Sequence, residues 1–121
     1  MIEITNPKHY DLEERTFLFA KQCRSLVKKL SKTVGNFEDS KQLIRSSGSV
    51  HANYIEANEA LSKIDFYYRT KICRKETKES RSWLKFLDIN ESKELETMRE
   101  KLVGESEELM KIFGAIITKA K

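Results

Sequence analysis

The sequence predicts an all-α fold, an up-down-up-down antiparallel four-helix bundle, and three observations lead to it. The 121 residues contain only one proline and four glycines. That is too few for a β-sandwich or barrel, whose short strands need turn residues every ~8–12 positions. Charged residues make up 35% of the chain and hydrophobic residues 39%, a composition typical of long amphipathic helices. Four amphipathic stretches follow one another with short links, which forces neighbouring helices to run antiparallel.

The first helix is expected over about residues 11–34. We place Asp11 at its N-cap, with Glu14 completing a capping box. Its apolar residues recur at the spacings of a buried helical stripe: Leu12, Phe19, Cys23, Leu26 and Leu30, widened by Phe17, Ala20 and Val27. Gly35 follows where a left-handed C-terminal cap is expected.

The second helix is expected over about residues 37–60, and its centre is unusually rich in small residues. Its inward positions are Leu43, Ser47, Val50, Tyr54 and Ala57. Serine and glycine lower helix propensity, glycine by up to ~1 kcal/mol relative to alanine. The small patch, Ser46, Ser47, Gly48 and Ser49, therefore indicates that another helix or a ligand approaches closely.

The third and fourth helices are expected over about residues 63–87 and 91–119. Ser62 is the predicted cap of the third, whose inward positions are Phe66, Thr70, Cys73, Thr77, Ser80, Leu84 and Leu87. The inward positions of the fourth are Leu95, Met98, Leu102, Glu105, Leu109, Ile112 and Ile116, with Val103, Phe113 and Ile117 beside them. We divide the chain into an N-terminal extension, 1–10, and one domain, 11–119.

The net charge of +4 is unevenly distributed. Residues 63–85 carry eight basic and three acidic residues, a local excess of +5, whereas residues 91–109 carry three basic and seven acidic residues, a local −4. A surface divided in this way can attract polyanions on one side, or let subunits pair an acidic face with a basic one.

Two segments carry a resemblance to a known family. Residues 42–57 read QLIRSSGSVHANYIEA and residues 66–80 read FYYRTKICRKETKES. The first segment has a glutamine and an arginine before a small-residue patch, and then Ala-Asn-hydrophobic-x-Glu-small. It resembles the signature of bacterial four-helix-bundle proteins encoded in intervening sequences of large-subunit ribosomal RNA genes. The second segment is similar to the later half of that pattern, and the resemblance covers roughly residues 10–118.

This resemblance implies a four-helix bundle that assembles as a ring-shaped homopentamer, without enzymatic activity, and that binds nucleic acid through basic surfaces. The same family includes the accessory variability determinant of diversity-generating retroelements, which assembles with a reverse transcriptase. The sequence departs from the pattern at Ala57 and Asn58, where many members have glycine and a basic stretch. Nucleic-acid contacts at the link between the second and third helices are therefore not carried over.

The residues predict no catalytic site, no metal and no cofactor, and hence no enzyme. His9 lies near the N-terminal end, and His51 is interpreted as a surface or interface residue, because neither has a helical His or Cys partner. Cys23 and Cys73 lie on apolar faces and are expected in the core. The chain has no phosphate loop, GxSxG or HExxH motif. Two separated cysteines suit a reducing cytoplasm, and neither a signal peptide nor an apolar run of about 18 residues is present, so no membrane partner is expected.

Polar residues on the second helix predict a structural network. Arg45 and Glu56 lie on one helical stripe, with Asn53 beside it. Because unpaired buried charge is costly, we expect partners on the third helix: Glu76 for Arg45, and Arg69 or Arg74 for Glu56. The alternative is a small polar pocket between the two helices.

Two rows of cations have helical spacing and are the candidate nucleic-acid-binding residues. One is Lys71, Arg74, Lys75, Lys78, Arg81 and Lys85, and the second is Lys21, Arg24, Lys28 and Lys32. Such rows neutralise several phosphates at once, and Trp83, Tyr67 and Tyr68 are candidates to stack bases. The alternative is a solvated face and a packing role for Trp83.

Several apolar residues fall off the inward positions and predict self-association: Ile44, Ile55, Tyr68, Ile72, Phe86 and Ile117. The sequence thus predicts a homo-oligomer, pentameric by resemblance, that binds RNA or DNA. The alternative is a protein-interaction scaffold that docks a nucleic-acid-processing partner such as a reverse transcriptase.

Overall fold

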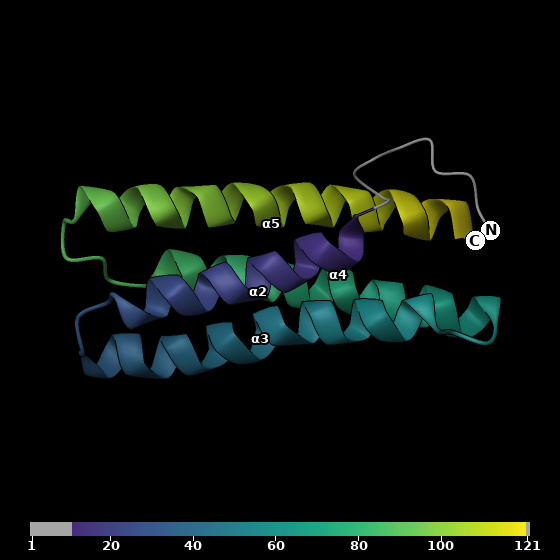
Figure 1. Ribbon diagram of the computed structural model, residues 1–121, viewed down its shortest axis with the longest axis horizontal. Coiled ribbons are helices and arrows are strands. Elements are labelled where there is room, and N and C mark those ends of the chain that lie inside the picture. The colour runs from purple at the N-terminus through teal and green to yellow at the C-terminus, as the bar shows by residue number, and fades with distance from the viewer. Residues whose placement is uncertain (1–10, 121) are drawn as a thin grey trace.

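The computed structural model describes residues 11–120, which form four helices: α2 (Leu12–Lys28), α3 (Val34–Asn58), α4 (Lys63–Phe86) and α5 (Lys93–Ala120). Successive helices run in opposite directions along one long axis (Figure 1). The predicted up-down-up-down four-helix bundle is therefore confirmed. The expected N-terminal extension, 1–10, and His9 within it lie outside the described residues.

One hydrophobic core runs along the inside of the bundle and takes side chains from all four helices. Its largest fully buried members include Phe19 of α2, Leu43 of α3, Leu84 of α4 and Phe113 of α5. Within each helix, the core residues recur every three or four positions, because only one face of the helix points inward. Burial of such side chains contributes roughly 1.5–3 kcal/mol each, so the core supplies the main driving force for the fold.

Small polar side chains line the contact between α3 and α4. Ser46 and Ser80 are fully buried, and their hydroxyl oxygens lie 2.8 Å apart. The Ser80 hydroxyl also lies 2.9 Å from the Glu76 carbonyl oxygen. Because these side chains are short, the two helix backbones approach closely, as the small-residue patch predicted.

The first helix ends earlier than expected, at Lys28 rather than near residue 34. Gly35 is not a C-terminal cap: it lies in the first turn of α3, and no described glycine has a positive φ. The Thr33 hydroxyl accepts a hydrogen bond from the Asn36 N–H at 3.1 Å and so begins α3, because an extended threonine satisfies a free N–H of a helix start. Ser62 caps α4 in the same way, as predicted, through the Asp65 N–H at 3.1 Å.

Three further expectations from the sequence are wrong. Asp11 stands at the N-cap of α2 but makes no side-chain capping hydrogen bond, so no capping box forms with Glu14. Phe17 was expected to widen the inward stripe, yet it is 46% exposed. Its position leaves it at the outer edge of the α2–α3 contact. Ile117, one of the apolar residues that predict self-association, is instead buried.

The two connections at one end of the bundle are joined to each other. The Asn36 side chain is buried; its amide donates to the carbonyl oxygens of Ser31 and Asp88, and its oxygen accepts from the Asp88 N–H. Asn90 and Glu91 have positive φ values of 54° and 61°, so the α4–α5 connection turns sharply before α5 begins. No helix within the described range is both long and apolar enough to cross a membrane.

Candidate nucleic-acid interface

The basic residues of α4 form its outer face. Thr70, Cys73, Thr77, Ser80 and Leu84 are buried at alternating spacings of three and four, so the intervening positions point away from the core. Five of the six predicted cations are exposed and Arg81 is partly exposed. We call this set the α4 basic face: Lys71, Arg74, Lys75, Lys78, Arg81 and Lys85.

Most of the α4 basic face has no acidic partner. Among the described residues, only Arg81 forms an ion pair, with Nη1 3.4 Å from Glu107 Oε2 of α5. Lys71 Nζ lies 5.3 Å from the centre of the Tyr67 ring, a cation–π contact that leaves the ammonium group accessible. Several cations that a phosphate chain can reach are therefore uncompensated on one helix face.

The α4 basic face continues into a groove between α4 and α5. This groove of about 370 Å³ is lined by Arg74, Arg81, Glu107, Met110 and Lys111. A larger groove of about 590 Å³ lies around the α2–α3 connection, near Val34 and Phe37, and takes none of the α4 cations. Of the α4 basic face, Arg74 and Arg81 line the smaller groove.

The second predicted row of cations does not form one continuous stripe. Lys32 lies in the α2–α3 connection, because α2 already ends at Lys28. Arg24 folds onto α3, where Nη2 lies 3.5 Å from the Ile44 carbonyl oxygen, and Nη1 donates to the Ala20 carbonyl oxygen. Lys21 Nζ lies 5.7 Å from the centre of the Phe17 ring.

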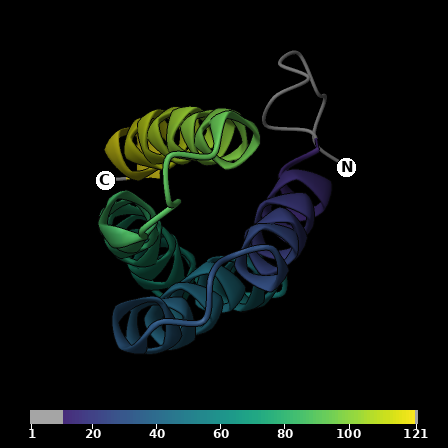
Figure 2. The same ribbon diagram turned by 90° about the vertical axis from the view of Figure 1, so that its left-hand side faces the viewer.

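The two rows also lie on different sides of the bundle. The end-on view places α2 and α4 at opposite corners, with α3 and α5 between them (Figure 2). Outward-facing side chains of α2 and α4 therefore point in different directions. A short, straight nucleic-acid strand that follows the α4 basic face does not reach the α2 cations of the same chain.

Trp83 is not positioned beside the basic face. It packs against the hydrophobic core and lies with its ring centre 5.8 Å from that of Phe86. The reason is helical geometry, since two residues along a helix correspond to roughly 200° of rotation, which separates Trp83 from Arg81 and Lys85. Tyr68 is 62% exposed, while Tyr67 is partly buried under Lys71.

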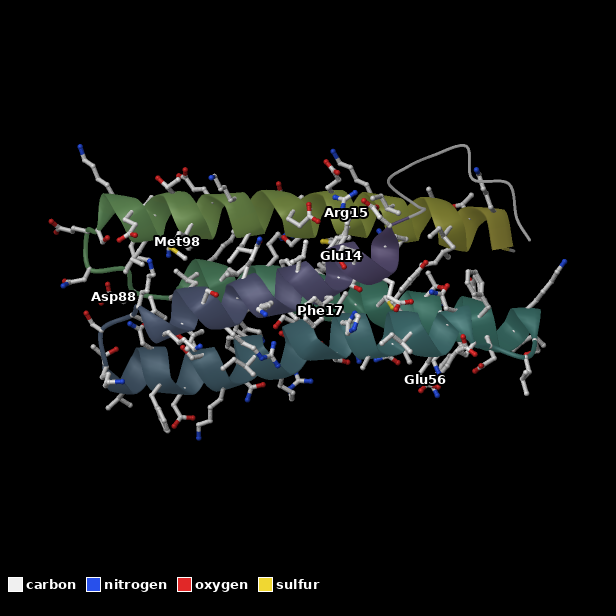
Figure 3. All side chains as sticks on the ribbon, in the orientation of Figure 1. Glu14, Arg15, Phe17, Glu56, Asp88 and Met98 are labelled. Atoms are coloured by element: carbon white, nitrogen blue, oxygen red, sulfur yellow. The ribbon has the colours of Figure 1, made fainter. Side chains whose placement is uncertain are left out.

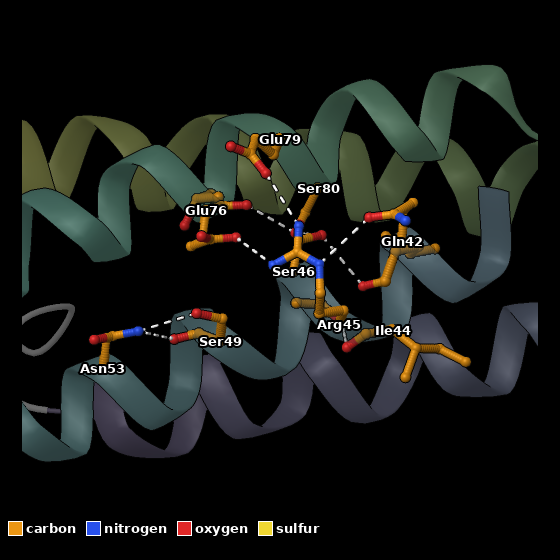
Figure 4. A network of polar contacts seen from close by, with 12 residues as sticks. Gln42, Ile44, Arg45, Ser46, Ser49, Asn53, Glu76, Glu79 and Ser80 are labelled. Atoms are coloured by element: carbon orange, nitrogen blue, oxygen red, sulfur yellow. Dashed lines mark hydrogen bonds and ion pairs between the residues drawn. The ribbon is translucent and has the colours of Figure 1, made fainter. Parts of the chain in front are cut away.

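The predicted polar network is centred on Arg45, whose guanidinium reaches from α3 to two carboxylates of α4 (Figure 4). Arg45 Nη1 lies 3.5 Å from Glu76 Oε1, and Nη2 lies 3.3 Å from Glu79 Oε1. The Glu76 side chain is only 10% exposed, whereas that of Arg45 is 53% exposed. Arg45 Nε also donates to Gln42. This arrangement holds a buried carboxylate beside a partly solvated cation.

The other two members of the predicted network lie apart from Arg45. The Asn53 side-chain oxygen accepts a hydrogen bond from Arg69 Nη1 at 3.1 Å, while its amide donates to Ser49. Glu56 is exposed (Figure 3) and pairs with neither Arg69 nor Arg74. The expectation for Glu56 is wrong because Arg69 is already held by Asn53 and Asp65.

The sequence reasoning missed the ion-pair cluster that joins α2 to α5. Arg15 Nη2 lies 2.8 Å from Glu105 Oε1 and 2.7 Å from Glu108 Oε1, and the Arg15 side chain is 14% exposed. Figure 3 labels Arg15 at the start of α2, beside α5. The hydrogen bond to Glu105 is the main cause that raises the pKa of Arg15 above its ordinary value. The available signal was Glu105 itself, an acidic residue at an inward position of a predicted helix.

The remaining candidate reactive groups are enclosed by packing. Cys23 and Cys73 are buried, and burial raises the pKa of each thiol to about 12. His51 Nδ1 lies 2.9 Å from the Thr16 hydroxyl, and its ring meets that of Phe17 edge-on. In the part of the chain described, no three His, Cys, Asp or Glu side chains are grouped as metal ligands would be.

Comparison with known proteins gives two findings. The sequence profile of a family described as 23S rRNA-intervening sequence protein matches residues 8–115. A crystal structure of a protein of unknown function from the S23 ribosomal protein family, from Bacteroides thetaiotaomicron, is similar, with a TM-score of 0.72 and 31% sequence identity. The match covers 87% of this chain and 96% of that one. None of the curated proteins matches this chain.

Proposed function

Because the chain belongs to the family of 23S rRNA-intervening sequence proteins, we propose that it is a non-enzymatic, homo-oligomeric four-helix bundle that binds nucleic acid. The contact surface is the α4 basic face. Binding is electrostatic and independent of base sequence, because lysine and arginine side chains neutralise phosphates, whatever the bases attached to them.

One observation carries this proposal: on the α4 basic face, Arg81 alone has an acidic partner among the described residues. Elsewhere in the bundle, Arg15, Arg45 and Arg99 each contact at least one carboxylate. Lys21 and Lys28 of α2 also form no ion pair among the described residues, but α4 places six cations on one outer face. Acidic residues are abundant on α5, yet most of the cations of α4 are left uncompensated. Unpaired cations in a row release counterions when phosphates replace them, which favours binding at low salt.

The competing interpretation is that the α4 basic face is only solvated, as most charged helix faces are. The two interpretations differ in their response to mutation. If the face only keeps the protein soluble, replacing its cations changes the net charge and nothing else. If it binds phosphates, the same replacements abolish an affinity that other cations of the chain do not supply.

Exposed apolar side chains support the homo-oligomeric part of the proposal. Val34 and Phe37 project at one end of the bundle, while Leu61 and Ile64 project at the other, Leu61 being fully exposed at 100%. Exposed apolar groups of this kind are typical of protein–protein contacts. The acidic start of α5 and the α4 basic face give complementary charges for a head-to-tail contact, which closes into a ring. The proposed state is a pentamer.

The same exposed apolar ends favour a second candidate function, a scaffold that docks a nucleic-acid-processing protein such as a reverse transcriptase. In that case Phe37 or Leu61 would contact the partner, and the α4 basic face would guide encounter or remain solvated. The scaffold predicts no affinity of the isolated protein for nucleic acid.

A titration of labelled single- and double-stranded RNA and DNA at two salt concentrations separates these functions. The nucleic-acid function predicts binding at low salt that weakens steeply at higher salt and is lost in the triple variant Arg74→Ala, Lys78→Ala, Arg81→Ala. Circular dichroism checks that this variant remains helical. Absence of binding by the unaltered protein at low salt rejects the nucleic-acid function and leaves the scaffold.

A further inference from the structure

The groove between α4 and α5 gathers cations from two helices around a single carboxylate. Arg74 and Arg81 come from α4, Lys111 comes from α5, and Glu107 is the one acidic residue that lines it. A groove with three cations and one carboxylate has a net charge of +2, and its apolar wall is Met110. Positive charge in a concave site concentrates anions more strongly than the same charge on a flat surface.

In this groove, the Arg74 side chain lies next to Gly114 of α5. A Cβ atom at Gly114 would lie 3.8 Å from Arg74 Nε and 3.9 Å from its Cζ. The guanidinium therefore rests against the helix where the side chain is smallest. Within the described residues Arg74 forms no ion pair, so its donors remain available for an anion. The planar fork of an arginine loses less conformational freedom per hydrogen bond to an oxyanion than a lysine ammonium does.

The ion pair between Arg81 and Glu107 is weak enough to be replaced. Its single contact is 3.4 Å, and the two side chains are 28% and 48% exposed. The contacts of Arg15 with its two carboxylates are 2.7 and 2.8 Å, within the range typical of strong charge-assisted hydrogen bonds. Exposed single-contact pairs contribute little to stability, so an incoming oxyanion displaces Glu107 from Arg81 at low cost.

Along the same seam, the charge changes sign toward the α4–α5 connection. A second groove is lined by Lys85 and Arg99 but also by Glu96, Glu100 and Glu107. The Arg99 guanidinium in this groove is already hydrogen-bonded, since it donates to the Leu87 carbonyl oxygen and to Glu96, both at 2.7 Å. An anion is therefore favoured at the Arg74 end of the seam and opposed at the Lys85 end.

We propose that the groove at Arg74, Arg81 and Lys111 binds a phosphate group, and that Glu107 competes with this phosphate for Arg81. The inference deepens the function proposed above and rests on it: it assigns one phosphate of the bound strand to a defined subsite. The phosphate is either an internal phosphodiester or a terminal phosphate monoester, which share the anionic oxygens that two guanidinium groups and an ammonium recognise.

Two matched pairs of variants of the full chain test this inference. Glu107→Gln removes the competing carboxylate, whereas Glu100→Gln removes an equal charge from the neighbouring groove. Lys111→Gln removes a cation of the site. Its control, Lys101→Gln, removes an equal charge from the side of α5 that meets α2, because Lys101 precedes by one helical turn Glu105, which pairs with Arg15. Affinity is measured by fluorescence anisotropy at low salt, with single-stranded RNA that carries either a 5′-hydroxyl or a 5′-phosphate.

We expect Glu107→Gln to bind about two- to fivefold more tightly than Glu100→Gln, and Lys111→Gln to bind more weakly than Lys101→Gln by a similar factor. Lys111→Gln should also make the dependence of log affinity on log salt shallower, by less than about one in slope. If Lys111→Gln weakens both RNAs equally, the site holds an internal phosphodiester. If it weakens only the 5′-phosphorylated RNA, the site holds the terminal phosphate.

Equal affinities within both matched pairs, with the unaltered protein still binding RNA, would overturn the subsite and leave the proposed function standing. Absence of binding by the unaltered protein rejects the proposed function itself. The two failures are therefore distinguishable in one experiment.

Discussion

Asn36 and Asp88 join the two connections at one end of the bundle, although 52 residues separate them in sequence. The Asn36 amide donates to the Asp88 carbonyl oxygen at 2.9 Å, and the Asp88 N–H donates to the Asn36 side-chain oxygen at 2.8 Å. The Asn36 side chain is buried, and both hydrogen bonds are partly buried. The pair fixes the start of α3 relative to the end of α4.

Replacing Asn36 by alanine should therefore destabilise the fold by about 1–3 kcal/mol, since it removes three partly buried hydrogen bonds at once. Asp88→Ala is the control, because the hydrogen bonds with Asn36 use only its backbone, and its own carboxylate accepts from the Asn90 N–H. Urea unfolding measures both variants. Equal losses of stability in the two variants would contradict the role assigned to the Asn36 side chain.

Arg45 should stabilise the bundle through the buried carboxylate of Glu76. Arg45→Ala leaves that charge without its cation, and we expect a loss of about 1–2 kcal/mol, below the value for fully buried pairs because Arg45 is half exposed. In the double variant with Glu76→Gln, part of the loss should be recovered. Lys41→Ala, which removes an exposed pair with Glu38, should change stability by less than about 0.5 kcal/mol. Thermal unfolding of the unaltered protein, Arg45→Ala, Glu76→Gln, the double variant and Lys41→Ala tests this. Additive losses for Arg45 and Glu76 would count against the pairing.

The two cysteines should be unreactive in the folded protein. Burial raises the pKa of Cys23 and Cys73 to about 12 from a usual value of 9.0, so neither forms the thiolate that reacts with disulfide reagents near neutral pH. Modification should be fast only in denaturant. Ser82→Cys, at an exposed position of α4, provides a reactive control thiol.

The same pKa shift has a consequence for stability at high pH. Below pH 9 both folded and unfolded thiols are protonated, whereas between pH 9 and about 12 the thiols ionise only in the unfolded chain. Ionisation then favours unfolding, so the contribution of the thiols to stability is lost as the pH rises through this range. A variant with both cysteines replaced by alanine should lose stability less steeply above pH 9, and an unchanged slope would be inconsistent with buried thiols.

Two glycines within helices should respond differently to alanine. A Cβ at Gly104 meets nothing within 4 Å, so Gly104→Ala should stabilise the protein by about 0.5–1 kcal/mol through helix propensity. A Cβ at Gly48 would lie 3.2 Å from Arg24 Nη2 and would shift the end of that side chain. Gly48→Ala should therefore stabilise less than Gly104→Ala in chemical denaturation, and the reverse order would be evidence against the observed position of Arg24.

Periodicity along the chain was sufficient to predict the four helices. The contact between Arg45 and Glu76 was predicted from the cost of an unpaired charge on an inward stripe, which requires a partner on the neighbouring helix. The early end of α2 was not predictable in this way: Gly35 suits a helix end, and Thr33 suits a helix start. In the structure this segment is a helix start, because the Thr33 side chain caps α3. The contact between Asn36 and Asp88 joins residues distant in sequence, and no local pattern encodes it.

The candidate site was predicted only in part for a similar reason. Spacing along one helix placed the α4 basic face correctly on a single exposed surface. The ion pair between Arg81 and Glu107 depends on how α5 is rotated against α4. The residue spacing of one helix does not specify that rotation. The separation of the α2 row from α4 likewise depends on the order of helices around the bundle.

The proposed function assigns nucleic-acid binding to α4 rather than to the total charge of the protein. The most direct test is the salt dependence of RNA affinity for three proteins: the unaltered chain, an α4 variant with Lys71, Lys75 and Lys78 replaced by glutamine, and an α2 variant with Lys21, Arg24 and Lys28 replaced by glutamine. Both variants lose three positive charges. If the α4 basic face binds the RNA, the slope of log affinity against log salt becomes shallower only in the α4 variant. Equal slopes for the two variants would contradict it.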